Sequence, residues 1–335
     1  MVAKIELLDC TLRDGGHVNN WQFGNDKISR ILENLNRARV DFIEMGFLRD
    51  TDYSNDRSLF SSIEQANKFL DNKEVSSNFT LMIRPDWISF DYLPQAKKIN
   101  TLRWAFYEKD FPLLIKQVEI AKNAGYSIYL NPINVFAYSE DSLKNLLLIL
   151  NDLEPDGVSI VDTFGSLFPS DLTNYLSLFT DNLHEKIKLG LHLHENLSLS
   201  FALAIQFIRE IGSSRDIVID SSLLGMGRAP GNLPTELIIP FLNNECNKCY
   251  NLNSILKTID DEIKPLKKMF KWGYSPEYAI TAFNRIHRSY AEYLIDDLSA
   301  SLEDVSQVTE SVIAEHLENS FDAQFAKHSL EKSND

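Results

Sequence analysis

Eight short apolar segments recur along the chain, and an amphipathic helical pattern or a long polar loop follows each of them. The segments lie at residues 5–9, 42–46, 79–83, 102–106, 127–130, 157–161, 187–193 and 217–219. This alternation predicts βα units and a parallel sheet. Eight such units can close a (β/α)8 TIM barrel. A doubly wound open sheet is the alternative, although no G-x-G-x-x-G motif follows the first segment to support its dinucleotide-binding form.

The chain changes character after about residue 250, where helical patterns continue without a further strand candidate. Helices are predicted at residues 252–270, 276–286, 289–297 and 302–316, and the polar tail 327–335 is expected to fray. We therefore expect a TIM-barrel domain over residues 1–250 and a helical extension over residues 251–335 that packs on the barrel.

Net charge restricts the partners that this chain can bind. The 335 residues carry a formal net charge of −15, and the sequence pI is about 4.9. This balance argues against nucleic acid and against anionic membrane surfaces, because both attract a basic face. No apolar run approaches the roughly 18 residues of a membrane span, and the first residues enter a strand without the apolar core of a signal peptide. We expect a cytoplasmic protein.

Cys246 and Cys249 form a C-x-x-C pair. A structural zinc site would need two further ligands at similar spacing, and the sequence has no second pair. A redox pair of the thioredoxin type would lie early in a small βαβ unit. We therefore expect two loop cysteines that stay reduced.

The densest polar chemistry follows the first strand, in Arg13, Asp14, Gly15, Gly16 and His17. Strand ends of this kind hold the active sites of α/β barrels. The glycines allow a sharp turn and close approach of a ligand to the backbone. Asp14 can bind a hard cation, Arg13 can hold a carboxylate or a developing oxyanion, and His17 can move a proton near neutral pH. A surface ion pair between Arg13 and Asp14 is the alternative interpretation.

A second cluster lies at the end of the seventh strand, where His192 and His194 are two residues apart. Alternate residues of a strand point the same way, so both imidazoles face one side. With Asp14 they would form a site of two histidines and one carboxylate with open positions. Such ligands suit Mn²⁺, Mg²⁺, Co²⁺ or Fe²⁺ better than structural zinc. A histidine pair that serves only packing is the alternative.

Other strand ends carry polar residues that a packed core would not need. Glu44, within reach of Arg13, would fix the guanidinium plane or form a plain salt bridge. Asn131, Asp162 and Thr163 end the fifth and sixth strands and are candidate substrate contacts.

A glycine-rich stretch at residues 225–231 follows the eighth strand. Loops at this place commonly bind phosphate or carboxylate through backbone N–H groups. Asn232, which follows it, is either the N-cap of the next helix or an oxygen ligand of the metal.

Together these motifs resemble the DRE-TIM metallolyase (HMGL-like) family, which includes isopropylmalate and homocitrate synthases, hydroxymethylglutaryl-CoA lyase and 4-hydroxy-2-oxovalerate aldolase. The matching stretches lie, in chain order, at residues 11–15, 44–46, 162–165, 192–196 and 225–232. The resemblance covers about residues 4–245. It implies a TIM barrel, a divalent cation on Asp14, His192 and His194, and catalytic use of Arg13. Mn²⁺ is the expected cation, with Mg²⁺ or Co²⁺ as alternatives.

Within the family, His17 favours the aldolases. The Claisen-type synthases and the CoA lyase carry Gln at this place, whereas 4-hydroxy-2-oxovalerate aldolases carry His. Residues 196–199 and 273–278 also resemble those aldolases, which indicates Tyr278, or else Tyr274, as a residue that orients or protonates the substrate.

The resemblance thus implies a carbon–carbon lyase that cleaves or forms a 4-hydroxy-2-oxo acid, with pyruvate as the enolate half. Arg13 would stabilise the enolate oxygen, and His17 would take the proton from the 4-hydroxyl. The expected partner is a small 2-oxo acid, and a homo-oligomer or a dehydrogenase partner stays open. The alternatives are a Claisen-type acyltransferase or CoA lyase, and a barrel that binds metal without catalysis.

Overall fold

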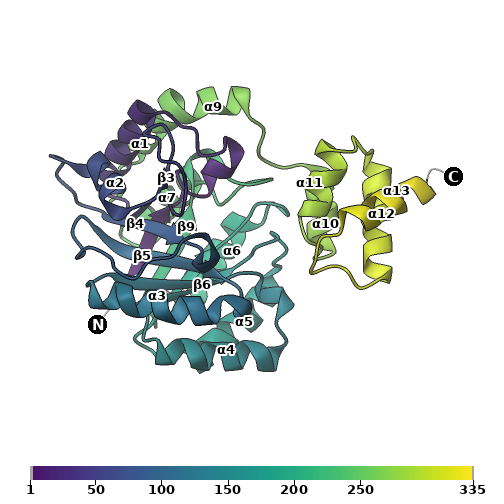
Figure 1. The fold of residues 1–335 in the computed structure, drawn as a ribbon, viewed down its shortest axis with the longest axis horizontal. Helices are drawn as coiled ribbons and strands as arrows, with labels where there is room; N and C mark the ends of the chain where they lie inside the picture. Colours follow the sequence, from purple (N-terminus) through teal and green to yellow (C-terminus); the bar gives the residue numbers. More distant parts are fainter. Residues whose placement is uncertain (1–2, 334–335) are drawn as a thin grey trace.

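The computed structural model describes residues 3–333 and contains a closed β-barrel (Figure 1). Its strands are β1 (Ile5–Asp9), β2 (Phe42–Leu48), β4 (Asn78–Ile83), β5 (Ile99–Phe106), β6 (Ser127–Pro132), β7 (Gly157–Val161), β8 (Lys188–His192) and β9 (Ile217–Ser221). All neighbours are parallel, and β1 pairs with both β2 and β9, which closes the sheet. The TIM-barrel prediction is confirmed, and the open sheet is excluded. The two-residue β3 (Leu59–Phe60) only adds to the end of β2.

Helices cover the outside of the barrel. They are α1 (Asn25–Arg37), α2 (Ile63–Asn67), α3 (Phe111–Asn123), α4 (Glu140–Asp152), α5 (Pro169–Asn182), α6 (Ser200–Ile211), α7 (Thr235–Glu245), α8 (Leu252–Thr258) and α9 (Lys264–Met269). Neither α2 nor α5 was predicted from the sequence. In α5 the buried residues Leu172, Leu176 and Phe179 recur at helical spacing, so the apolar pattern was present.

The barrel interior changes from apolar to charged along its axis. One buried apolar cluster in the barrel contains Leu8, Cys10, Phe42, Tyr129 and Val218. Three polar residues each lie two positions after a member of this cluster: Glu44 after Phe42, Asn131 after Tyr129 and Asp220 after Val218. Residues two apart in a strand face the same side, so these polar groups point into the barrel above the apolar layer. The strand period therefore places the charged site on an apolar floor.

The last helices form a second body beside the barrel, at the right of Figure 1. They are α10 (Pro276–Phe283), α11 (Ser289–Asp296), α12 (Leu302–Ala314) and α13 (Ala323–Ser333). Their own hydrophobic core includes Tyr290, Leu294 and Val308. By contrast, α8 and α9 pack against the barrel core through Ile255 and Leu266. We call α10–α13 the helical cap.

The expectation of a frayed tail is wrong as far as Ser333, where α13 ends. Ala326 is fully buried in the core of the helical cap, and Phe325 and Leu330 pack against that core. The remaining residues 334–335 of the predicted tail lie outside the described residues. Within residues 3–333, no helix combines the length and the apolar character needed to cross a membrane.

Candidate active site

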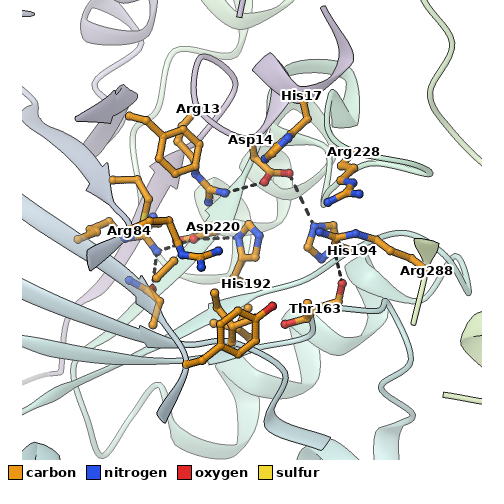
Figure 2. Close-up of a pocket in the computed structure, with 18 of the residues that line it drawn as sticks. Arg13, Asp14, His17, Arg84, Thr163, His192, His194, Asp220, Arg228 and Arg288 are labelled. Carbon is orange, nitrogen blue, oxygen red and sulfur yellow. Dashed lines mark hydrogen bonds and ion pairs between the residues drawn. The ribbon is translucent and has the colours of Figure 1, made fainter. Parts of the chain in front are cut away.

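The carboxyl ends of the barrel strands enclose a cavity of about 260 Å³ (Figure 2). Most of the predicted site residues line it, namely Arg13, Asp14, His17, Asn131, Thr163, His192 and His194. Glu44, Asp162 and Tyr278 do not belong to its wall. The structure thus gathers residues from distant parts of the chain at one place, as the closure of the barrel requires.

Asp14, His192 and His194 surround a space of the size of a metal ion. One ligand atom from each lies within 4.8 Å of the others, and all three side chains are buried. Nε2 of His194 lies 3.7 Å from Oδ2 of Asp14. Glycine at position 227 keeps this space open, because a Cβ there would lie 3.0 Å from the same Asp14 oxygen. These nitrogen and oxygen donors fit a divalent cation.

Hydrogen bonds behind both imidazoles fix their orientation. Nδ1 of His194 donates to the backbone oxygen of Asp162 at 2.7 Å, which leaves Nε2 facing Asp14. Nδ1 of His192 lies 3.0 Å from Oδ2 of Asp220. Metal-binding histidines commonly donate their second N–H to a carbonyl or a carboxylate in this way. Burial lowers the pKa of His192, although the Asp220 carboxylate acts to raise it. The lowered pKa favours the neutral imidazole that a metal needs.

Asp14 is ionised despite its burial. Burial acts to raise the pKa of Asp14, but the Arg13 guanidinium, together with His194 and His192, holds this pKa well below its usual value. The carboxylate that a divalent cation requires is therefore present at neutral pH.

Asn232 is the fourth polar group at this space. Its Nδ2 donates to Oδ2 of Asp14 at 2.8 Å, whereas its Oδ1 is buried without a hydrogen-bond partner. The two ends of an asparagine amide have nearly the same shape, and exchanging them would turn the unpartnered oxygen toward Asp14. Asn232 does not cap α7, because the N-cap position is Pro234. The N-cap alternative is thus wrong.

A chain of buried ion pairs supports Arg13. Arg13 donates from Nη1 to Asp14 and from Nε to Glu44, both at 2.6 Å. The other oxygen of Glu44 accepts from Nη1 of Arg103 at 3.1 Å, and Nη2 of Arg103 donates to Asp220 at 2.6 Å. Glu44 is fully buried behind Arg13. It therefore orients the guanidinium and does not reach the cavity.

Arg103 and Asp220 were not predicted as site residues. Arg103 stands between Leu102 and Trp104 inside β5, and a charged side chain in an apolar strand must be paired when it is buried. That signal was available in the sequence. The role of Asp220 depends on β9 lying next to β8, which becomes visible only once the barrel is closed.

His17 lies in a short 3₁₀ turn, Gly15–Val18, that follows β1. Its ring packs edge-on against Trp21 with 4.6 Å between the centroids, and Trp21 Nε1 donates to the backbone oxygen of Arg13 at 2.7 Å. A Cβ at position 16 would lie 2.0 Å from Trp21 Cδ1, so this close approach requires Gly16. Burial lowers the pKa of His17 to about 3, which keeps the imidazole neutral near pH 7.

Asp162 requires a correction, since its carboxylate does not face the cavity. Its two oxygens accept hydrogen bonds from the backbone N–H groups of Ser166 and Leu167 at 2.8 and 3.3 Å. Asp162 therefore holds the loop after β7, and its backbone oxygen orients His194. The sequence shows a carboxylate at a strand end, but not that nearby amides will bind it.

The other predicted substrate contacts differ in their placement. Asn131 and Thr163 reach the cavity wall, where Asn131 accepts from Arg103 at 3.1 Å and Thr163 Oγ1 accepts from the backbone N–H of Asn134 at 2.7 Å. Tyr278 is half-buried on α10 and lies outside the wall, and Tyr274 is 66% exposed. Neither tyrosine contacts the cavity in this structure.

Comparison with known proteins agrees with this geometry. Residues 108–261 match the HMGL-like family model. The 4-hydroxy-2-oxovalerate aldolase of Shewanella halifaxensis is 23% identical over 279 residues, which cover 78% of each chain. The oxaloacetate decarboxylase of Mycobacterium tuberculosis is 23% identical over 246 residues, which cover 70% of this chain and 69% of that protein.

A solved structure shares the fold. The N-terminal domain of a candidate aldolase from Bacteroides vulgatus superposes with a TM-score of 0.73 at 22% identity, covering 88% of this chain and 98% of the other. The family match lies within the barrel and the helices that pack on it, and it includes both histidines of the candidate metal site. Over residues 108–261, this chain is therefore similar to the HMGL-like family.

Proposed function

We propose that the protein is a divalent-metal-dependent aldolase that cleaves or forms a 4-hydroxy-2-oxo acid, with pyruvate as the enolate half. The observation that carries this proposal is the buried group Asp14, His192 and His194 in one cavity with Arg13 and His17. A cation on these ligands would act as a Lewis acid toward the carbonyl of a 2-oxo acid. Mn²⁺ is the cation that we expect, with Mg²⁺ or Co²⁺ as alternatives.

Arg13 is positioned to stabilise negative charge on a substrate oxygen. Its Nε and Nη1 are engaged by Glu44 and Asp14, so the guanidinium is held in one plane. The Nη2 group remains to donate to the pyruvate oxygen that gains charge as the enolate forms. A donor that is fixed before the reaction loses little free energy to reorganisation in the transition state.

His17 is the group that we assign to the other proton transfer. During cleavage its neutral ring accepts the proton of the 4-hydroxyl while the bond between C3 and C4 breaks. The bonding electrons pass to the pyruvate half as its enolate, and the aldehyde leaves. During synthesis the enolate carbon attacks the aldehyde carbonyl, and His17 returns the proton to the new hydroxyl oxygen.

Two further observations favour an aldolase over a Claisen-type enzyme. Cleavage of a 4-hydroxy-2-oxo acid and decarboxylation of oxaloacetate, the reactions after which the two relatives are named, both leave pyruvate as an enolate. The cavity of about 260 Å³ also lies below the range of roughly 300–1,000 Å³ that accommodates drug-sized ligands. A small 2-oxo acid suits this space better than a whole acyl-CoA.

The test is cleavage of 4-hydroxy-2-oxopentanoate by the purified protein with Mn²⁺, followed as release of pyruvate. We expect cleavage that stops with a chelator and returns with added metal. Release of thiol from acetyl-CoA in the presence of a 2-oxo acid, without cleavage, would assign the Claisen-type reaction. Tight Mn²⁺ binding with neither reaction would indicate a barrel that binds metal without catalysis.

A further inference from the structure

The cavity contains more positive charge than the proposed chemistry needs. Besides Arg13 and Arg103, three guanidinium groups line its wall, namely Arg84, Arg228 and Arg288. Figure 2 shows Arg228 and Arg288 on the side of His17 and His194, with Arg84 across the site in this view. Arg228 and Arg288 are close enough to His17 to lower its pKa. In a chain with a net charge of −15, such a cluster requires an explanation.

Arg288 is the least satisfied of these groups. The other guanidinium groups of the wall each form an ion pair with a carboxylate: Arg13 with Asp14, Arg84 with Asp86, Arg103 with Asp220 and Arg228 with Glu292. Within residues 3–333, Arg288 has no such ion pair. Its Nη1 donates to the backbone oxygen of Thr163 at 2.7 Å, and its Nε is buried without a hydrogen-bond partner.

The surroundings of Arg288 leave one positive charge unbalanced. Glu292 binds Arg228 through two hydrogen bonds at 2.6 and 2.7 Å, and Asp14, the other carboxylate that acts on Arg288, is paired with Arg13. Burial, with a smaller contribution from Arg228, lowers the pKa of Arg288 to about 10, and the group is still charged near pH 7. A buried charge of this kind is costly unless an anion pairs with it.

His287 adds a neutral donor at the same place. It lines the cavity, and its Nδ1 accepts from the backbone N–H of Ser289 at 3.2 Å. The proton of the neutral ring is therefore on Nε2. A carboxylate or phosphate accepts hydrogen bonds from a guanidinium and from an imidazole N–H alike.

Docking of the helical cap does not explain Arg288. The cap also contacts the barrel through the ion pair of Arg285 with Asp171 at 2.8 Å and through the rings of Phe283 and Phe168, 5.9 Å apart. These contacts lie outside the cavity wall. A guanidinium that served docking alone would not need to line the cavity without a carboxylate partner.

We propose that the aldehyde half of the substrate carries an anionic group, a carboxylate or a phosphate, and that Arg288 and Arg228 bind it. This inference rests on the proposed aldolase function. His17 marks the side of the 4-hydroxyl, so an anion beside Arg228 and Arg288 belongs to the aldehyde half and not to pyruvate. The helical cap would then determine which aldehyde the barrel uses.

The experiment compares matched aldehydes in the direction of synthesis, with pyruvate and Mn²⁺, following product formation by NMR. Succinic semialdehyde against butanal tests a carboxylate, and glyceraldehyde 3-phosphate against glyceraldehyde tests a phosphate. Charge-assisted hydrogen bonds of ordinary strength predict that kcat/KM for one anionic aldehyde exceeds that for its neutral partner by about 10- to 100-fold. The pair of aldehydes in which the anionic member reacts faster shows whether the site binds a carboxylate or a phosphate.

Variants assign the preference to residues. Arg288→Met should raise KM for the anionic aldehyde by about 10-fold or more and leave the neutral one within about 3-fold. Arg288→Lys should restore part of the preference. Arg285→Met is the matched control, since it removes an arginine that links the cap to the barrel outside the cavity, and it should keep the ratio of the parent.

Two results would overturn the proposal. One is a parent protein that uses both members of each pair equally well, and the other is an Arg288→Met variant that loses activity equally for both. If Arg288→Met does not fold, the preference of the parent and the Arg288→Lys variant still decide the matter. Deuterium exchange into pyruvate, which needs no aldehyde, separates this failure from a failure of the aldolase function itself.

Discussion

The carboxylate of Asp220 lies behind His192, with Oδ2 at 3.0 Å from Nδ1 of the imidazole. The same oxygen accepts from Arg103, which in turn pairs with Glu44, the partner of Arg13. Asp220 therefore connects a candidate metal ligand to the residues that hold the guanidinium of Arg13. Burial acts to raise the pKa of Asp220, but Arg103 and His192 outweigh this effect and lower the pKa below its usual value. The carboxylate therefore stays ionised.

Asp220→Asn should weaken metal binding without abolishing it. The amide removes the charge that makes His192 a good donor, and changes of this kind typically cost about 10- to 100-fold in metal affinity. Calorimetric titration with Mn²⁺ measures the effect, and His192→Ala should lose tight binding. Asp216→Asn, at the residue that precedes the same strand, is the matched control. Equal affinity in parent and Asp220→Asn would remove Asp220 from the site.

Arg13→Lys should cost more than conservation of charge suggests. A lysine ammonium cannot keep the planar contacts with Glu44 and Asp14 and also donate to an enolate oxygen. We expect kcat to fall by about 10²-fold or more, as for loss of an oxyanion donor. The exposed Arg39→Lys provides the control. A change confined to KM would mean that Arg13 binds only the substrate carboxylate.

His17→Ala should affect two proton transfers unequally. Cleavage needs a base at the 4-hydroxyl, and its loss should lower the rate by about 10²–10⁴-fold. Exchange at C3 of pyruvate is a different transfer, and it should fall much less. The exposed His184→Ala should match the parent in both assays. If His17→Ala cleaves at the parent rate, the base is another group.

Asp9→Asn should change how stability depends on pH. Burial raises the pKa of Asp9 from 3.8 to about 6, against hydrogen bonds from Thr11 and Thr235. The folded state thus favours the protonated acid, and the stability that this contributes is present below about pH 4 and lost as the pH rises through 6. Between about pH 5 and pH 7.5, the parent should lose roughly 1 kcal/mol that Asp9→Asn does not lose.

Urea unfolding of the parent and of Asp9→Asn at the two pH values gives the free energy of unfolding of each protein. The pH effects of other groups are the same in both proteins and cancel when the two are compared. Parallel changes in both proteins would show that Asp9 has no raised pKa.

Local spacing was enough to predict part of the site. His192 ends β8 and His194 lies two residues beyond it, and the spacing correctly predicted that both side chains lie at one site. Asp14 lies at the same site because all strand ends of a barrel meet at one opening. The apolar segments likewise gave the strands, since each begins or ends within a few residues of its prediction.

Contacts between distant segments could not be predicted in this way. Arg288 donates a hydrogen bond to Thr163, which is 125 residues away in the sequence, and it lies beside a different hydrophobic core. No local sequence pattern predicts this contact. For Asp162, the sequence shows the carboxylate but not which hydrogen bonds it will form. The amides of Ser166 and Leu167 become available to it only when the loop after β7 has folded.

The measurement that tests the central claim most directly is deuterium exchange into C3 of pyruvate, because it requires the enolate and nothing else. In D₂O with Mn²⁺, we predict rapid loss of the methyl proton signal with the parent protein. Exchange should stop with a chelator and in Asp14→Asn, whose amide replaces the carboxylate ligand. A parent protein that binds Mn²⁺ but exchanges pyruvate no faster than Mn²⁺ alone would contradict the assignment.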